Sequence, residues 1–134
     1  MTTDDPDRLG RTALHYAALD GPVDQVRDLV ASGANVAATD KQGFTPLHLA
    51  CQQYRADVVE VLLDAGAPVD PIDAWGSTPL YRAVFNAKGD PAVVRRLVSA
   101  GADPDLAIAS GRSPRELAEM IASCDTSGFF DTPA

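Results

Sequence analysis

The chain has 134 residues, of which 46% are hydrophobic, so it is long enough to form one domain with a buried core. Its 19 acidic residues against 11 basic ones give a net charge of −8, which disfavours nucleic acid as a partner because phosphates repel such a surface. We expect neither a membrane span nor a secretory signal, because no long apolar run is present and the chain begins with an acidic segment.

One short sequence motif occurs four times along the chain. The sequence GRTALH begins at residue 10, and related sequences follow at intervals of 33, 33 and 35 residues as GFTPLH, GSTPLY and the weaker GRSPRE. A second sequence motif has the same spacing and begins at Gly33, Gly66 and Gly101. Self-similarity at this period is typical of a stacked repeat array, in which each unit buries its apolar face only against its neighbours.

Each unit of the repeat predicts a turn followed by two helices. In the second copy, Asp40 begins a β-turn, Thr45 is a helix N-cap and Pro46 takes the first helical position. We expect a first helix at about residues 46–53 and a second at about 56–64, with apolar residues at helical spacing. A glycine in the left-handed region then ends each second helix, at Gly33, Gly66 and Gly101. The whole chain should therefore form seven helices, two in each of three units and one in the fourth, without an extended sheet.

The sequence TPLHLA at residues 45–50 matches the core of the ankyrin repeat, and the chain resembles that family over about residues 7–122. The resemblance implies an all-α fold, an ankyrin-repeat solenoid of stacked helix-turn-helix units with projecting β-turn fingers. It also implies an L-shaped stack, in which the first helices line a concave face and the second helices form the back. The family's histidine bonds to the backbone of the neighbouring finger, which implies a structural role for His15 and His48.

We expect one repeat domain, preceded by a short acidic segment and followed by a C-terminal tail. The segment covers residues 1–6, the domain 7–124 and the tail 125–134, with units at about 7–39, 40–72, 73–107 and 108–124. The last unit should act as a C-terminal cap. Because the chain begins with methionine and both ends look capped, we expect a complete protein.

Two departures from the repeat are informative. The third unit has two extra residues within 85–90, which lengthen the link between its helices. In the fourth unit, Arg115 and Glu119 stand where the repeat has apolar or small residues, as expected on the outer side of a terminal cap. In the tail, Phe129 and Phe130 either fold back over the exposed end or belong to a disordered segment.

No set of residues points to catalysis. His15 and His48 are the only histidines, and helices stacked about 8–10 Å apart hold two imidazoles too far apart to share a metal ion. Cys51 is expected to be a small buried residue, and two cysteines are too few for a disulfide scaffold, which favours a reduced, cytoplasmic protein. Asp7, Asp40 and Asp73 recur with the turns and are interpreted as turn-formers. We therefore predict no catalytic residues, no metal site, no cofactor and no enzymatic activity.

Function is expected at the positions that vary between units, because the fold does not fix their identity. By the resemblance, these positions lie at the finger tips and at the ends of the first helices. The candidate partner-binding residues are Arg8, Leu9, Arg11, Lys41, Gln42, Phe44, Gln52, Gln53, Trp75, Ser77, Phe85, Asn86 and Arg112. The three aromatic residues are the candidate anchors of an interface. The alternative is that Phe44 and Trp75 pack sideways on neighbouring fingers.

The charges are also unevenly placed in the expected fold. The finger tips carry Arg8, Arg11, Lys41 and Arg112, whereas many acids fall on the second helices and the back loops. A locally basic groove on an acidic body favours a partner with an acidic or mixed-charge patch. The alternative is that an acidic back only keeps the protein soluble.

We interpret the chain as a monomeric, non-enzymatic module that binds another protein through its concave face, with no membrane contact. By analogy with small bacterial ankyrin-like proteins, it could be an immunity or inhibitor protein that blocks a toxic enzyme. A scaffold or adaptor would use the same surface, and a self-associating structural module is the third alternative.

Overall fold

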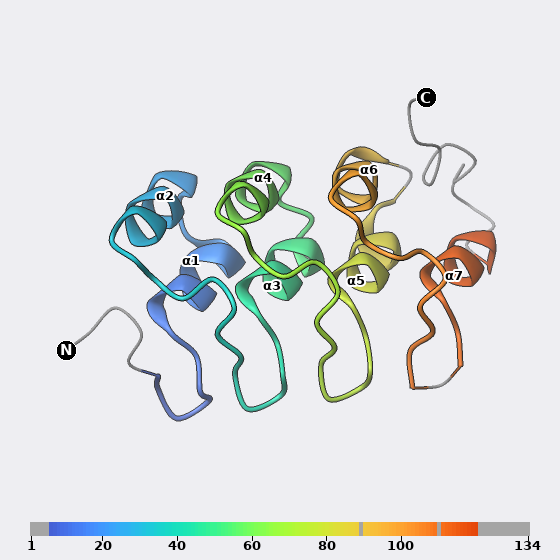
Figure 1. Cartoon of the computed structure of the whole chain (residues 1–134), viewed down its shortest axis with the longest axis horizontal. Helices are drawn as coiled ribbons and strands as arrows, with labels where there is room; N and C mark the ends of the chain where they lie inside the picture. Colours follow the sequence, from blue (N-terminus) through green and yellow to red (C-terminus); the bar gives the residue numbers. More distant parts are fainter. Residues whose placement is uncertain (1–5, 89, 110, 121–134) are drawn as a thin grey trace.

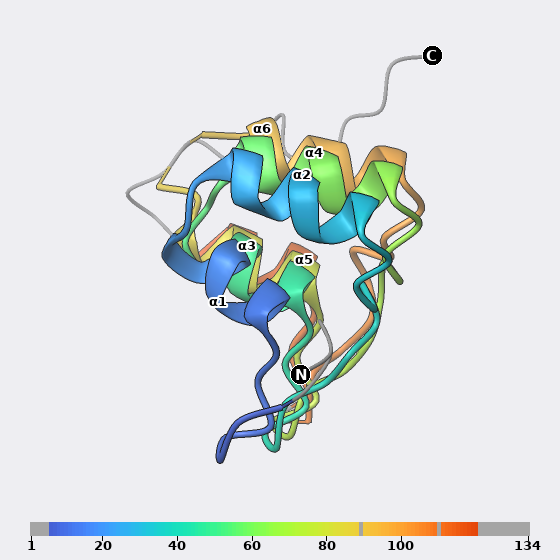
Figure 2. The same cartoon turned by 90° about the vertical axis from the view of Figure 1, so that its left-hand side faces the viewer.

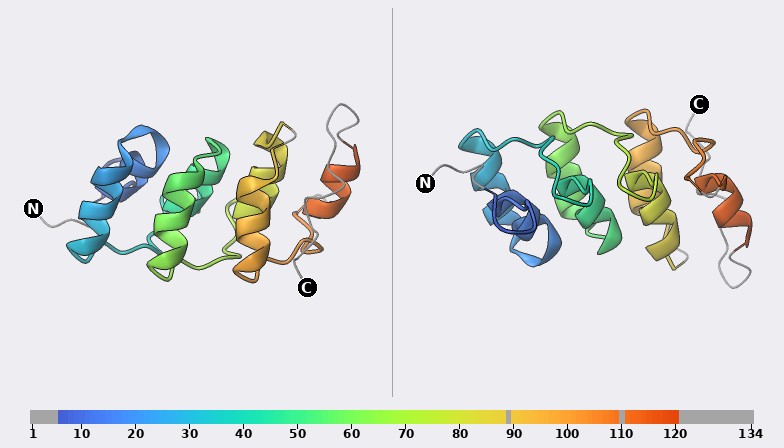
Figure 3. Two further views of the ribbon diagram at one scale, coloured as in Figure 1. Left: turned by 90° about the horizontal axis from the view of Figure 1, so that it is seen from above. Right: turned by 90° about the horizontal axis from the view of Figure 1, so that it is seen from below.

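The computed structural model describes residues 6–88, 90–109 and 111–120. These residues form seven short helices and no strand, as predicted. Figure 1 shows the helices in two tiers, with the first helices of the units below the second helices. The first helices are α1 (Ala13–Asp20), α3 (Pro46–Gln52), α5 (Pro79–Asn86) and α7 (Pro114–Met120), and the second helices are α2 (Val23–Ala31), α4 (Ala56–Asp64) and α6 (Ala92–Ser99). Seen from above and from below, successive units lie side by side in a row (Figure 3).

The first helices begin where the sequence predicts. The Thr45 hydroxyl accepts a hydrogen bond from the N–H of His48 at 3.2 Å, and Thr78 does the same for Tyr81 at 3.1 Å. A proline follows each of these two threonines, where its missing N–H leaves no helical bond unmade. α3 ends at Gln52, one residue before the predicted end, because Tyr54 adopts the left-handed conformation with φ 54°.

The core runs along the junction of the two tiers. Leu14, Leu47 and Leu80 are fully buried at equivalent positions of successive first helices. Leu62 and Leu97 are fully buried on the second helices, as their helical spacing predicts. All residues from Pro46 to Cys51 are buried, because α3 is enclosed between α1 and α5. The units therefore share one continuous core, in keeping with the expected solenoid.

The loops that precede the first helices project beyond both tiers as fingers, which gives each unit the outline of an L (Figure 2). One backbone hydrogen bond joins each described pair of neighbouring finger tips. These bonds run from the N–H of Lys41 to Leu9 O (2.9 Å), from Ala74 to Gln42 O (2.8 Å) and from Ala109 to Trp75 O (3.3 Å). Gly76 has φ 75°, and a Cβ there would lie 2.7 Å from Ala109 N. This turn therefore requires glycine both for its backbone conformation and for the space beside Ala109.

The described part of the fourth unit carries exposed charged side chains on α7. Arg115 and Glu119 are exposed on α7, and Arg115 Nε donates to Asp105 Oδ1 at 2.8 Å. Cys124, Phe129 and Phe130 lie outside the described residues. None of the helices described is long and apolar enough to cross a membrane.

Candidate partner-binding surface

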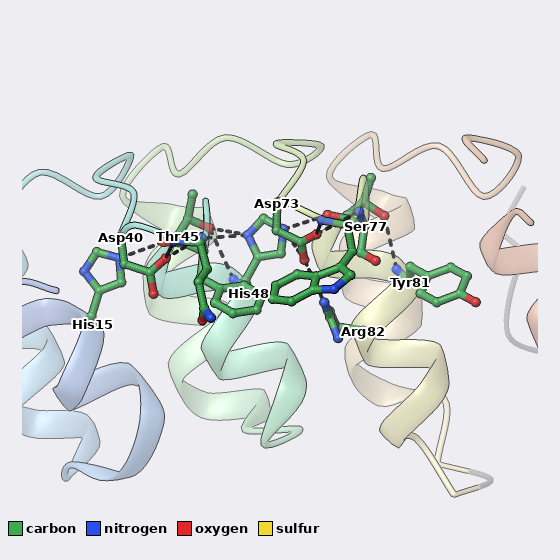
Figure 4. Close-up of polar contacts among 12 residues, drawn as sticks. His15, Asp40, Thr45, His48, Asp73, Ser77, Tyr81 and Arg82 are labelled. Atoms are coloured by element: carbon green, nitrogen blue, oxygen red, sulfur yellow. Dashed lines mark hydrogen bonds and ion pairs between the residues drawn. The ribbon is translucent and has the colours of Figure 1, made fainter. Parts of the chain in front are cut away.

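Each of the first two units has one buried histidine that connects it to the finger of the next unit (Figure 4). His15 Nε2 lies 2.8 Å from Phe44 O, and His48 Nε2 lies 2.9 Å from Ser77 O. Each Nδ1 accepts the N–H of the helix N-cap, Thr12 at 3.1 Å and Thr45 at 3.2 Å. A backbone carbonyl can only accept, so Nε2 must carry the proton and each ring is neutral.

Burial lowers the pKa of both histidines, which agrees with this neutral, fully bonded state. Both nitrogens of each ring are occupied, so neither imidazole is placed to act as a base or to bind a metal. The described residues contain no group of three His, Cys, Asp or Glu that could hold a metal ion. The structural role that the resemblance implied for His15 and His48 is what the geometry shows.

Two buried aspartates shape the second and third fingers. Asp40 Oδ1 accepts the N–H groups of Gln42 (2.8 Å) and Phe44 (2.9 Å). Asp73 Oδ1 accepts those of Trp75 (2.9 Å) and Ser77 (3.0 Å). These bonds fold each turn onto its own carboxylate, as expected of a turn-forming aspartate.

The second oxygen of each carboxylate binds an arginine. Arg11 Nε donates to Asp40 Oδ2 at 3.2 Å. Arg82 donates from Nε at 3.3 Å and from Nη2 at 2.9 Å to Asp73 Oδ2 (Figure 4). The Asp73 side chain is fully buried, whereas 27% of the Arg82 side chain is exposed, so Arg82 lies between the carboxylate and the solvent. Both ion pairs compensate the arginine charge locally, so these two side chains give the groove less net positive charge than the sequence alone predicts.

Phe44 and Trp75 pack on each other, but their exposure differs sharply. Their ring centroids lie 5.7 Å apart with an interplanar angle of 21°. Phe44 is 7% exposed, and its other neighbours include the His48 ring at 5.8 Å, whereas Trp75 is 51% exposed. The Arg82 guanidinium carbon lies 5.3 Å from the Phe44 centroid and 5.7 Å from that of Trp75. The alternative of sideways packing is therefore realised, with Phe44 as the inner ring and Trp75 as the outer one.

This packing changes how two candidate residues are interpreted. Phe44 and Ser77 are both buried, so as side chains they offer little surface to a partner, contrary to their selection as contact residues. Phe44 supports Trp75 from beneath, and Ser77 supplies the backbone carbonyl that His48 binds. Sequence position alone could not separate them from their exposed neighbours, because burial here depends on the adjacent finger.

A hollow of about 470 Å³ lies where the fingers meet the first helices, and we call it the finger hollow. It is lined by Arg11, Gln42, Phe44, Gln52, Trp75, Ser77, Tyr81, Arg82 and Ile108. The first six were predicted from the sequence, and the last three were missed. Tyr81 replaces the histidine of the first two units, and Arg82 follows it at a position that also varies, so a unit-by-unit comparison could have found both.

A second hollow of about 350 Å³, the helix-end hollow, shares Gln52 with the first. It is lined by Gln52, Gln53, Tyr54, Asn86, Ala87, Lys88 and Asp90. The Tyr54 hydroxyl donates to the carbonyl of Asp90 and accepts the N–H of Val93 at 3.3 Å, which connects the lengthened link of the third unit to the second unit. Burial raises the pKa of Tyr54 to about 12.

The remaining candidates are exposed but line neither hollow. These residues are Arg8, Leu9, Lys41, Phe85 and Arg112. Phe85 is 66% exposed on α5, whose next residue, Asn86, lines the helix-end hollow. Eight of the thirteen candidates therefore line one or both of the two hollows, and the other five line neither.

Acidic residues on the back of the stack are partly compensated. Arg96 on α6 bonds to Glu60 Oε2 at 2.7 Å and Asp64 Oδ1 at 3.1 Å, both on α4. The hydrogen bond that Arg96 donates to Glu60 is the largest cause of the raised pKa of Arg96. Asp24 pairs with Arg27 on α2 at 3.0 Å. These exposed pairs contribute little to stability.

Comparison with known proteins agrees with the repeat geometry. A family model described as Ankyrin repeats (3 copies) matches residues 14–108. No curated protein matches the chain. Ankyrin repeats serve as protein–protein interaction modules, so binding another protein is the general function that this match indicates. The matched region covers the two-tier stack from α1 to the fourth finger, and the chain belongs to the ankyrin repeat family.

Proposed function

We propose that the chain binds its partner protein through the concave side of the stack, with the finger hollow at the centre of the interface. The observation that carries this proposal is the half-exposed indole of Trp75, which the fold holds in place without burying it. Tryptophan is among the residues most enriched at the energetic centres of interfaces. No other large aromatic side chain lines the finger hollow with this much exposed surface in the described residues.

Trp75 is supported from three directions. Phe44 stacks beneath it, Arg82 lies beside it, and the Asp73 carboxylate binds its backbone N–H at 2.9 Å. A side chain fixed in this way loses little conformational entropy when a partner covers it, so more of the contact energy appears as affinity.

The composition of the finger hollow favours a partner with an acidic or mixed-charge patch. Its lining contains Arg11 and Arg82 and no acidic residue, although the whole chain has 19 acids. The carboxylates that compensate these arginines are buried beneath them and unavailable to a partner. Exposed Arg8, Lys41 and Arg112 on the finger tips add positive charge around the hollow. The attraction is therefore expected to act mainly on the rate of association.

We further propose that binding inhibits the partner, as an immunity protein inhibits a toxic enzyme. A scaffold must hold two partners at once and needs two separate surfaces. Gln52 lines both the finger hollow and the helix-end hollow, so the two are adjacent, and one partner that covers both favours inhibition over scaffolding. We expect the free protein to be a monomer. A dimer in gel filtration that Trp75→Ala dissociates would instead favour the alternative of a self-associating module.

The test begins with affinity capture from the native cell, using the full chain as bait and Trp75→Ala as a parallel bait. We expect at least one protein to be captured by the first bait and lost with the second. Its affinity for wild type and variants is then titrated, with a thermal melt of each variant. The control is Glu60→Gln on α4, which should leave affinity unchanged. If Glu60→Gln abolishes binding and Trp75→Ala does not, the assignment of the faces is wrong.

A further inference from the structure

Arg82 has a hydrogen-bonding edge that the fold leaves unused. A guanidinium has two edges that can bind a carboxylate, one formed by Nε and Nη2 and the other by Nη1 and Nη2. Both bonds to Asp73 come from Nε and Nη2, so the carboxylate occupies the first edge. In the described residues Nη1 makes no hydrogen bond. The second edge is therefore available to a ligand in the finger hollow, which Arg82 lines.

The same bonds hold Arg82 rigid. Asp73 fixes its first edge, and its guanidinium carbon lies 5.3 Å from the Phe44 centroid and 5.7 Å from the Trp75 centroid. Arginine is suited to planar recognition of a carboxylate, and an edge already oriented needs no further ordering when the ligand arrives. Arg11 is the weaker candidate, because only 18% of its side chain is exposed.

The surroundings of Arg82 combine one cationic donor with apolar surface. The half-exposed indole of Trp75 and the side chain of Ile108 line the same hollow. Gln42, Gln52 and Tyr81 add neutral polar groups, and no acidic side chain lines the hollow, since the Asp73 carboxylate that binds Arg82 is fully buried. A carboxylate placed on Arg82 would therefore have apolar neighbours on one side.

We propose that Arg82 is the specificity-determining residue of this surface, and that it receives an Asp or Glu side chain of the partner that is followed or preceded by an apolar residue packed on Trp75. This inference rests on the proposed function and deepens it, because it names the chemistry of the segment that enters the finger hollow. It also accounts for the arginine at a position occupied by Tyr16 and Leu49 in the first two units.

The experiment uses the full chain and a phage-displayed library of short random peptides. Selected peptides are synthesised and titrated by the fluorescence of Trp75, the only tryptophan of the chain. We expect each to carry an acidic residue beside an apolar one. Changing that acid to its amide should weaken binding to wild type by about tenfold or more, as for a hydrogen bond to a charged group. On Arg82→Gln the same change should matter less than about twofold, because the edge is absent.

Two further variants keep the result interpretable. Arg82→Lys retains the charge without the planar edge and should give an intermediate preference for the acid. Arg96→Gln removes an arginine that also bonds carboxylates, but on the back of the stack, and should behave as wild type. Thermal melts of all variants show that they are folded when titrated.

The outcomes separate this inference from the proposed function. Peptides that bind at Trp75 with no preference for an acid, or with a preference that survives in Arg82→Gln, overturn the inference and leave the proposed function standing. Peptides that bind without changing Trp75 fluorescence, or a selection that returns none, overturn both.

Discussion

Arg55 of the second unit caps the C-terminal end of α1 in the first unit, where it binds the carbonyl of Ala18. Its Nη1 donates to the carbonyl of Ala17 at 2.9 Å and to that of Ala18 at 3.2 Å, and Nη2 donates to the carbonyl of Gly21. The carbonyl of Ala17 also accepts the N–H of Gly21 at 3.0 Å, so the guanidinium adds a second bond there and supplies bonds to the carbonyls of Ala18 and Gly21 at a partly buried helix end. The bonds cross from one repeat to the next and thus couple α1 to the start of α4.

Replacing Arg55 with Met should keep most of the packed stem and remove these bonds. We expect a loss of about 1–3 kcal/mol of unfolding free energy, the usual cost of leaving a buried acceptor unsatisfied. Chemical denaturation measures it. The control is Arg27→Met, which breaks only the exposed pair with Asp24 and should change stability by less than about 0.5 kcal/mol. Equal effects of the two variants would contradict the capping role.

Leu62→Ala tests the shared core. Leu62 is fully buried on α4 in the second unit, so its truncation should cost about 2–5 kcal/mol in equilibrium denaturation. The transition should stay cooperative, because neighbouring units share one core. A loss below about 0.5 kcal/mol, as for a surface change, would mean that Leu62 is not in the core. Val61→Ala, at a partly buried neighbouring position, is the matched control and should cost less.

Phe44 and Trp75 should respond in opposite ways to truncation. Phe44→Ala removes a buried ring and should cost about 3–5 kcal/mol of stability, whereas Trp75→Ala should cost clearly less because half of its surface is exposed. In binding to a captured partner the order of the two variants should be reversed, because the more exposed ring offers more surface to the partner. Trp75→Ala should lose at least about 2 kcal/mol of binding free energy. The measurements are a melt and a titration of each variant. A Trp75→Ala protein that is unfolded while Phe44→Ala is stable would reverse the assignment of inner and outer rings.

Stability should fall on mild acidification because of the two histidines. Burial lowers the folded-state pKa of His15 and His48 below the ordinary value of 6.5, so the unfolded chain binds more protons between the two pKa values. The free energy of unfolding therefore decreases as the pH falls through 6.5 toward the folded-state pKa. A proton on Nδ1 would also face the N–H of Thr12 or Thr45.

Melts between about pH 7.5 and about pH 5.5 measure this effect, since most carboxylates stay ionised over that range. The double variant His15→Gln, His48→Gln should be less stable at neutral pH, because the histidine bonds to the neighbouring fingers are lost or weakened, but its melting temperature should vary less with pH. A wild-type melting temperature that rises on acidification would contradict the neutral, doubly bonded histidines.

The sequence by itself determined the repeat, because its signals are local. Thr45 caps α3 and Pro46 begins it through contacts within one turn, and the Asp40 turn is closed by its own carboxylate. The resemblance of the repeated motif to the ankyrin repeat also implied the bonds of His15 and His48 to the next finger, and the structure has them. The start of α3 and the burial of Leu62 and Leu97 follow from the same periodicity, whereas exposed Arg115 and Glu119 on α7 were expected from departures from it.

Only the tertiary structure decided which side chains of the candidate surface are available. Phe44 and Trp75 both read as exposed finger residues, and it is the neighbouring finger and α5 that cover one and leave the other half open. The bond of Arg82 to Asp73 and the cap of Arg55 on α1 likewise escaped prediction. Neither Arg82 nor Arg55 is part of the repeated sequence motif. Each depends on where non-repeating side chains of different elements meet, and the periodicity of the chain holds no information about that.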